Sequence, residues 1–217
     1  MPKITSVEPQ KSSKRRFNVF LDGQFGFGAD EDTVVRFRLI SGKEIPAEDL
    51  EKVIFETAVG KLMDRMYNLL SFRARTEKEI RGYLKRLNFK KKIKDQEQLS
   101  EIVQDALIAR LKTKGLLNDL EFTKAWVLSR GSKKSLMVVR GELIKKGVSR
   151  EIIEQVLSEE GVTDQTKIAQ SLLEKKWPRF NNLPPIERKK KAIEFLLRRG
   201  FSYDIAKTVI ENLLKKE

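Results

Sequence analysis

The sequence contains neither cysteine nor histidine among its 217 residues. Without cysteine the chain has no disulfide bond, no thiolate nucleophile and no redox motif. Without histidine it lacks the most frequent general base and the most frequent metal ligand. Together the two absences exclude the usual zinc sites and the His-activated nucleophiles, and they leave only carboxylate metal sites open. We therefore expect a protein that is not an enzyme and that uses no cofactor.

Long apolar stretches and nucleotide-binding loops are also missing. The sequence has no run of about eighteen apolar residues, so it predicts no membrane span. Residues 1–5 lack the apolar stretch of a secretory signal, and we expect the protein in the cytoplasm. Residues 25–28, FGFG, lack the third glycine and the strand–loop–helix setting of a dinucleotide loop, and no P-loop pattern occurs. An ATPase is therefore not expected.

Positive charge is what the sequence has in excess. Its formal net charge is +14 at pH 7. Residues 1–60 carry nine Lys and Arg against ten Asp and Glu, whereas residues 61–217 carry 36 against 21, a net charge of +15. Such a field attracts polyanions, so we expect nucleic acid, an acidic protein surface or both as partners.

One motif occurs twice in the second half of the chain. Residues 143–157 read LIKKGVSREIIEQVL and residues 196–210 read LLRRGFSYDIAKTVI, with Gly147 aligned to Gly200 at a separation of 53. In each copy a helix ends in two cations and a glycine suited to a left-handed cap, and a serine then caps the next helix. An internal repeat of this kind indicates one supersecondary unit that is used more than once.

A fainter third copy lies upstream. Residues 80–84, IRGYL, match residues 139–143, VRGEL, at a separation of 59. Thr76 and Glu79 precede this copy with the spacing of a capping box. Asn88 stands where Gly147 stands in the next copy, and we expect it to end its helix as a left-handed cap. The basic segment 90–92 would then lie in a loop.

These patterns predict a mainly α protein: an elongated tandem array of three three-helix repeats, with a small N-terminal β-hairpin plus a short helix. The hairpin is expected at the Asp22-Gly23 turn, with residues 1–14 loose before it. The predicted parts are 1–46 for the hairpin and short helix, 47–115 for the first repeat, 116–160 for the second and 161–217 for the third. The predicted helices cover 47–71, 76–87, 95–114, 119–130, 135–146, 150–159, 163–176, 185–199 and 203–215.

Basic residues follow the first helix of each predicted repeat. Loops at matching positions of stacked repeats tend to fall on one face, which predicts a positive stripe that binds a polyanion. The alternative is a set of solvated side chains scattered over the surface. The residues concerned are Arg73, Arg75, Arg130, Lys133, Lys134, Lys175, Lys176 and Arg179.

Two basic pairs precede the glycines of the repeated motif. Lys145-Lys146 and Arg198-Arg199 would lie in the last turn of a helix, where cations complement the helix dipole. The functional interpretation is contact with phosphate or carboxylate. Arginine can hold either group with two hydrogen bonds, so Arg198 and Arg199 are favoured as binding residues.

The densest basic run is Arg188-Lys189-Lys190-Lys191. It is either a solvated helix face or a contact surface, and one or two of its members have to point inward or snorkel because four helical residues span a full turn. Arg140 aligns with Arg81 of the faint copy. It is interpreted as a partner contact or as a bridge between helices.

The order of these short motifs is that of a known family. The segments concerned are Leu116-Leu117-Asn118-Asp119 with Phe122, Ala125, Trp126 and Arg130, then Gly141-Glu142-Leu143 with Lys146-Gly147-Val148, and Arg198-Arg199-Gly200-Phe201-Ser202. Over about residues 60–215 the chain resembles the RecX family, the bacterial regulators of the recombinase RecA. The resemblance implies a protein that binds the groove of the RecA–single-stranded DNA filament and inhibits strand exchange, ATP hydrolysis and filament extension.

The partners implied are the RecA filament and single-stranded DNA, with double-stranded DNA as a second candidate, and we expect a monomer. One alternative is a basic DNA-binding protein that works without RecA, since three-helix units commonly place a helix in the major groove. Tight, sequence-selective duplex binding would favour it. The other alternative is a nuclease with a carboxylate-bound metal, which sustained magnesium-dependent DNA cleavage would reveal.

Overall fold

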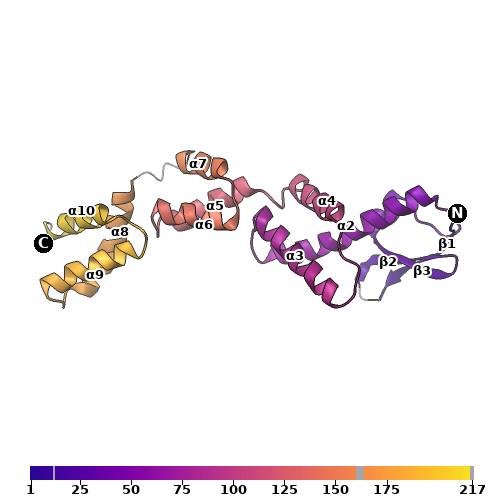
Figure 1. The fold of residues 1–217 in the computed structure, drawn as a ribbon, viewed down its shortest axis with the longest axis horizontal. Coiled ribbons are helices and arrows are strands. Elements are labelled where there is room, and N and C mark those ends of the chain that lie inside the picture. The colour runs from indigo at the N-terminus through magenta and orange to yellow at the C-terminus, as the bar shows by residue number, and fades with distance from the viewer. Residues whose placement is uncertain (12, 160–163, 216–217) are drawn as a thin grey trace. The chain divides into compact units, whose positions relative to one another are not determined.

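The computed structural model describes residues 1–11, 13–159 and 164–215. These residues form three strands, ten α-helices and one short 3₁₀ helix (Figure 1). They belong to two compact units, one of Met1–Ala74 with Arg81–Leu117 and one of Arg75–Ile80 with Asn118–Glu217. The predicted mainly α class, with three-helix groups and a small N-terminal β element, is confirmed.

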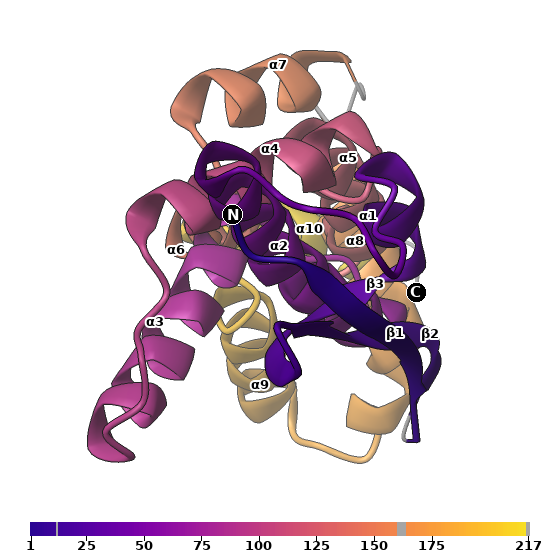
Figure 2. The same cartoon turned by 90° about the vertical axis from the view of Figure 1, so that its right-hand side faces the viewer.

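The N-terminal sheet has three antiparallel strands in the order β1 (Ile4–Gln10), β2 (Ser13–Leu21), β3 (Gln24–Asp30). Asp22 and Gly23 both have positive φ, 48° and 82°, as a primed two-residue turn requires, so the predicted hairpin is confirmed. The expectation that residues 1–14 are loose was wrong for β1, which pairs with β2 (Figure 2). The reason is burial, because Ile4 is fully covered by the core.

The first unit packs this sheet against helices. It contains α1 (Glu31–Arg36), α2 (Ala47–Ser71), α4 (Glu101–Thr113) and most of α3 (Glu77–Ile93). Figure 1 shows β2 and β3 beside α2. One apolar cluster joins sheet and helix: Ile4, Val19, Phe27, Ala29, Leu39, Ile45 and Val53. Residues on both sides of position 46 therefore share a core, and the predicted boundary there stays a prediction.

Helix α3 is longer than predicted. Asn88 lies inside the helix, and its amide accepts a hydrogen bond from Leu99 N at 2.8 Å and donates one to Leu99 O at 3.0 Å. The prediction of a left-handed cap at Asn88 was wrong because this side chain pairs with the backbone of the following loop. Residues 90–92 accordingly lie in the last helical turn rather than in a loop, and the left-handed residue comes later, at Asp95 (φ 51°).

The second unit contains two groups of three helices. They are α5 (Asp119–Gly131), α6 (Leu136–Lys146) and α7 (Arg150–Glu159), then α8 (Gln165–Lys176), α9 (Pro185–Leu197) and α10 (Tyr203–Leu214), with the 3₁₀ helix η1 (Trp177–Phe180) after α8. The first group closes on Phe122, Val127, Val139, Leu143, Val148, Ile153, Val156 and Leu157. The second closes on Ala169, Leu173, Trp177, Ala192, Phe195, Leu196, Phe201, Ala206, Val209, Ile210 and Leu213.

Candidate functional site

The two basic pairs lie in joints with the same glycine cap, but Lys145-Lys146 end α6 whereas Arg198-Arg199 follow the last residue of α9, so the prediction that both pairs lie in a last helical turn holds for the lysines only. The joints are the α6–α7 joint, residues 145–149, and the α9–α10 joint, residues 198–202. Gly147 and Gly200 have the same left-handed φ of 84°. The residue after each glycine, Val148 or Phe201, is buried and donates its N–H to a carbonyl five positions earlier, at 3.2 Å and 3.3 Å. The predicted glycine caps are thus present in both copies.

Each joint receives the start of the preceding group's middle helix. Thr76 Oγ1 donates to the carbonyl of Lys146 at 2.6 Å, and Ser135 N donates to the carbonyl of Arg199 at 3.0 Å. Thr76 and Ser135 occupy equivalent cap positions, 59 residues apart, in front of α3 and α6. Thr76 also forms the predicted capping box with Glu79, through two hydrogen bonds of 3.3 Å. One interface therefore occurs twice within the second unit.

A carboxylate neutralises one of the two cations of the α6–α7 joint, Lys146. Lys146 Nζ lies 3.1 Å from Glu79 Oε1 and 4.4 Å from the ring centroid of Trp126. Trp126 Nε1 donates to Glu142 Oε2 at 3.0 Å, and Lys134 Nζ lies 2.5 Å from Glu142 Oε1. Lys146 thus already has an acidic and an aromatic partner inside the protein, whereas Lys145 is exposed.

The pKa of Glu142 reflects its pairing with Lys134, Trp126 and Arg130. Burial alone raises the pKa of Glu142, but the hydrogen bonds from Lys134 and Trp126 and the charges of Lys134 and Arg130 outweigh it, so the pKa is lowered. Arg130 Nε contributes from 4.0 Å. The carboxylate therefore stays ionised at neutral pH, and the candidate binding residues Arg130 and Lys134 have a structural role here.

The α9–α10 joint lacks both carboxylates. Val138 stands where Glu79 stands in the other copy, and Phe195 stands where Glu142 stands. The guanidinium carbon of Arg199 lies 3.8 Å from the ring centroid of Phe195, and Nη1 donates to the Phe195 carbonyl at 3.3 Å. Among the described residues, no carboxylate forms an ion pair with Arg198 or Arg199. The two joints share a glycine cap and differ in which of their cations a carboxylate neutralises.

Burial lowers the pKa of Arg199, and the neighbouring charge of Arg198 lowers it further. A guanidinium nevertheless remains protonated in a protein at neutral pH. Arg199 is thus a half-buried cation beside the exposed cation of Arg198. An incoming anion would relieve their mutual repulsion, so this joint is suited to hold a phosphate or a carboxylate.

Arg140 and Arg188 are held by neighbouring helices. Arg140 donates from Nε and Nη2 to the two carboxylate oxygens of Glu154, each at 2.8 Å, so the structure shows the bridge between helices. Arg188 turns inward, with its guanidinium carbon 4.1 Å from the ring centroid of Trp177. This explains how a run of four basic residues fits on α9.

The remaining candidates differ in exposure. The exposed ones are Arg73, Lys133, Lys145, Lys175, Arg179, Lys189, Lys190 and Arg198. The half-buried ones are Arg75, Arg130, Lys134, Arg140, Lys146, Lys176, Arg188 and Arg199. Whether the exposed members share one face stays a prediction.

The sequence analysis did not predict the roles of two kinds of residue. Glu79 and Glu142 decide which cations are neutralised, and the only sequence signal was that each of them is lost from the copy that follows. The basic side chains of α3 were not among the predicted binding residues, although residues 81–94 contain seven Lys and Arg and no Asp or Glu. That bias in composition was the available signal.

In the part of the chain that the structure describes, no group of three or more carboxylates is placed to hold a metal ion. Among the described helices, none combines the length and apolar character needed to cross a membrane.

Comparison with known proteins gives consistent matches. Three family models match: Regulatory protein RecX N-terminal domain at residues 2–46, the second RecX three-helix domain at 118–157 and the third at 163–210. Regulatory protein RecX of Listeria monocytogenes serotype 4a (strain HCC23) is 31% identical over 95% of this chain and 74% of that protein. Regulatory protein RecX of Bacillus subtilis (strain 168) is 33% identical over 98% and 78%. A crystal structure of regulatory protein RecX matches with a TM-score of 0.66 and 26% identity over 97% of this chain and 100% of that chain.

Proposed function

This chain belongs to the RecX family of regulatory proteins, and we propose that it regulates RecA by binding the groove of the RecA–single-stranded DNA filament. Binding there inhibits strand exchange, ATP hydrolysis and filament extension. The protein acts through positively charged surfaces and carries out no chemistry of its own. Its partners are RecA and single-stranded DNA, with double-stranded DNA as a second nucleic-acid ligand, and the active species is a monomer in the cytoplasm.

The observation that carries this proposal is the unneutralised pair Arg198 and Arg199. Within a chain segment of net charge +15, this joint keeps two arginines that no described carboxylate pairs with. Arginine binds phosphate and carboxylate with two bonds, so the joint suits both the DNA and acidic patches of a filament. The exposed Lys175, Arg179 and Lys189 add to the same field.

The primary test measures ATP hydrolysis by RecA on single-stranded DNA with and without the purified chain. We expect hydrolysis to fall at substoichiometric amounts, because a bound regulator blocks growth of a filament that contains many RecA subunits. Strand exchange should fall in parallel. Unchanged hydrolysis and strand exchange at equimolar protein would refute the proposal.

A variant test addresses the arginine pair. Arg198→Ala with Arg199→Ala should weaken inhibition about tenfold, because charge-assisted contacts to phosphate are lost. Unfolding should change little, since the carbonyl of Arg199 still accepts from Ser135 N. The control is Lys61→Ala with Lys207→Ala, which removes two exposed cations elsewhere. A large loss of thermal stability with the same inhibition per folded molecule would show that the pair serves only as a cap.

Salt dependence tests the phosphate contacts. With about six contacts, the logarithm of the affinity should fall against the logarithm of the salt concentration with a slope near −4 on single strands and near −5 on duplex. A flat response would leave the basic surface without a DNA role. Tight duplex binding with strong sequence preference, unaffected by RecA, would instead favour a DNA-binding protein that works without RecA.

A further inference from the structure

Helix α3 carries a basic extension that its counterpart in the next group lacks. It has 17 residues, whereas α6 has 11. The α3 residues beyond Asn88, which aligns with Gly147, add Phe89 and the cations 90–92 to the helix. With seven Lys and Arg and no Asp or Glu over residues 81–94, this is a long stretch of chain without a carboxylate. Its charge therefore points to a polyanionic ligand.

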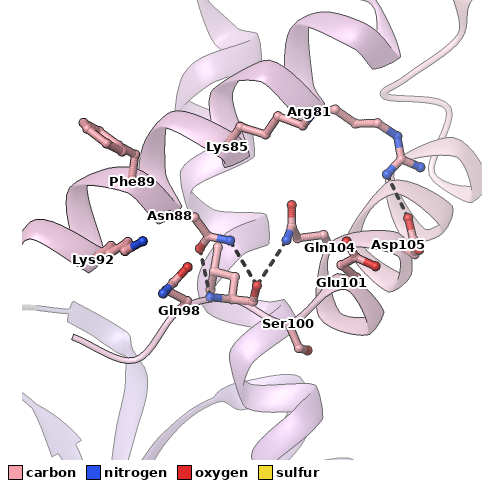
Figure 3. A pocket seen from close by; sticks show the side chains of 11 residues that line it. Arg81, Lys85, Asn88, Phe89, Lys92, Gln98, Ser100, Glu101, Gln104 and Asp105 are labelled. Carbon is pink, nitrogen blue, oxygen red and sulfur yellow. Dashed lines mark hydrogen bonds and ion pairs between the residues drawn. The ribbon is translucent and has the colours of Figure 1, made fainter. Parts of the chain in front are cut away.

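The extension borders a hollow of about 730 Å³ between α3 and the start of α4 (Figure 3). Phe89 and Lys92 lie at one end of the hollow, and Arg81 lies at the other end, paired with Asp105 at 2.8 Å. Lys85 lies between them on the same wall of α3. The spacing of 85, 89 and 92 puts these three side chains along one face over two helical turns.

The opposite wall of the hollow is fixed in place. Leu99 makes two hydrogen bonds with the Asn88 amide, and its carbonyl also accepts from Gln104 Nε2 at 3.1 Å. The hollow is thus formed before any ligand arrives. Preformed sites bind at a lower entropic cost than surfaces that must first be ordered.

The ring of Phe89 has no role in the core. Its residue is 65% exposed, and it adjoins the exposed Lys85 and Lys92. Among the described residues, no carboxylate pairs with either lysine, and Glu101 is the one acidic group of the lining besides the paired Asp105. An exposed aromatic ring between two free cations matches what an unpaired nucleotide offers, a flat base and a phosphate on each side.

We propose that this hollow binds single-stranded nucleic acid, with Phe89 stacked on an unpaired base and Lys85 and Lys92 on the flanking phosphates. The inference deepens the proposed function by adding a DNA contact in the first unit, but it holds equally for free single strands. A duplex is a poorer ligand because its bases are already stacked on both faces. An acidic protein surface would satisfy the lysines and leave the aromatic ring without a specific partner.

The experiment measures binding of a fluorescein-labelled oligo(dT) by fluorescence anisotropy, with the full chain at low salt. Phe89→Ala should weaken binding about tenfold, because one stacking contact is lost. Phe89→Trp should keep the affinity and Phe89→Leu should lose it, since stacking needs a ring and not only an apolar side chain. The matched control is Ile102→Ala, which truncates a 72% exposed side chain on α4 of the same unit.

The lysines are tested by salt dependence. Lys85→Ala with Lys92→Ala should reduce the slope of affinity against salt by about 1 to 2, whereas Lys61→Ala with Lys207→Ala should leave it nearly unchanged. All variants should keep the wild-type unfolding midpoint because the truncated side chains are exposed. Wild-type affinity and salt slope in Phe89→Ala and in the double lysine variant would overturn the proposal.

The outcomes separate this site from the proposed function. Phe89-dependent binding of oligo(dT) by a chain that leaves RecA unaffected would support the site and refute RecA regulation. RecA inhibition with Phe89-independent binding of oligo(dT) would refute the site alone. If the Phe89→Ala variant loses RecA inhibition while it keeps its affinity for oligo(dT), the hollow binds protein and the inference is wrong.

Discussion

The α6–α7 and α9–α10 joints share a glycine cap and differ in how many of their cations are neutralised. Both glycines have a φ of 84°, and both joints receive the start of a preceding helix. Yet Lys146 is paired with Glu79, while Arg199 lies against Phe195 without a described carboxylate partner. The requirement for cations at a helix end is met in both, so it does not explain the difference. The α9–α10 joint keeps two cations without a described carboxylate partner, whereas the α6–α7 joint keeps only Lys145.

Two copies of one repeated unit can keep the same cap and differ in charge. The cap needs a glycine in the left-handed conformation and a backbone carbonyl to accept its hydrogen bond. It therefore forms whether lysine or arginine precedes the glycine. Neutralisation needs a carboxylate on another helix. The α9–α10 joint has Val138 where the α6–α7 joint has Glu79, and Phe195 where it has Glu142. The carboxylate partners are therefore missing, but the cap remains. Unneutralised charge thus arises without any change in the glycine cap.

The largest effect should come from the glycines. Gly147→Ala and Gly200→Ala should each lower the free energy of unfolding by about 2–4 kcal/mol, from the left-handed penalty and from overlap of the new Cβ with Lys78 or Val138. Urea unfolding measures both. Gly141→Ala is the control, because a Cβ there meets open space within a helix and should stabilise slightly. Unequal losses at the two joints would break their structural equivalence.

The next largest effect is expected at Glu142, which has no counterpart at the α9–α10 joint. Glu142→Gln should lower the free energy of unfolding by about 1–2 kcal/mol at pH 7, because the hydrogen bond and charge from Lys134 are weakened. The pKa of Glu142 is lowered in the folded state, so its stabilisation is full above the ordinary value of 4.5 and is lost as the pH falls through the folded pKa. Urea unfolding from pH 7 to pH 3 should show the difference between the two proteins shrinking below pH 4.5. A difference that does not shrink as the pH falls would contradict the assignment.

Adding a carboxylate to the α9–α10 joint and removing one from the α6–α7 joint should change DNA affinity in opposite directions. Val138→Glu would give the α9–α10 joint the carboxylate that Glu79 supplies to the other, and the affinity for oligo(dT) should fall severalfold with a salt slope smaller by about 1. Glu79→Gln keeps the capping-box hydrogen bond and releases Lys146, so the affinity should rise slightly. Anisotropy titrations check both. Equal affinities across the set would mean that neither joint contacts nucleic acid.

The smallest effect is expected at Arg140. Its bidentate pair with Glu154 is exposed, so Arg140→Ala should change the free energy of unfolding by about 0.5 kcal/mol. A double-mutant cycle with Glu154→Ala isolates the pair. RecA inhibition should remain near wild type, because the bridge already occupies the guanidinium. A strong loss of inhibition would restore the interpretation of Arg140 as a partner contact.

Local patterns were sufficient for much of the fold. The glycine and serine of each joint, the capping box at Thr76 and the Asp22-Gly23 turn are short-range signals, and the structure contains all of them. The first strand was missed because Ile4 is buried only through residues far along the chain, in the cluster that also includes Val53. Asn88 was misassigned because its partner, Leu99, lies in a loop that the periodicity does not describe.

By itself, the sequence determined the absence of histidine and cysteine chemistry, the basic excess after residue 60 and the positions of the caps. These are properties of composition or of residues within one helical turn. Only the tertiary structure decided which cations are neutralised and which remain available. Glu79 lies 67 residues from Lys146, and no local pattern links them. Charges pair through space, so their balance at a joint depends on which helices the fold brings together.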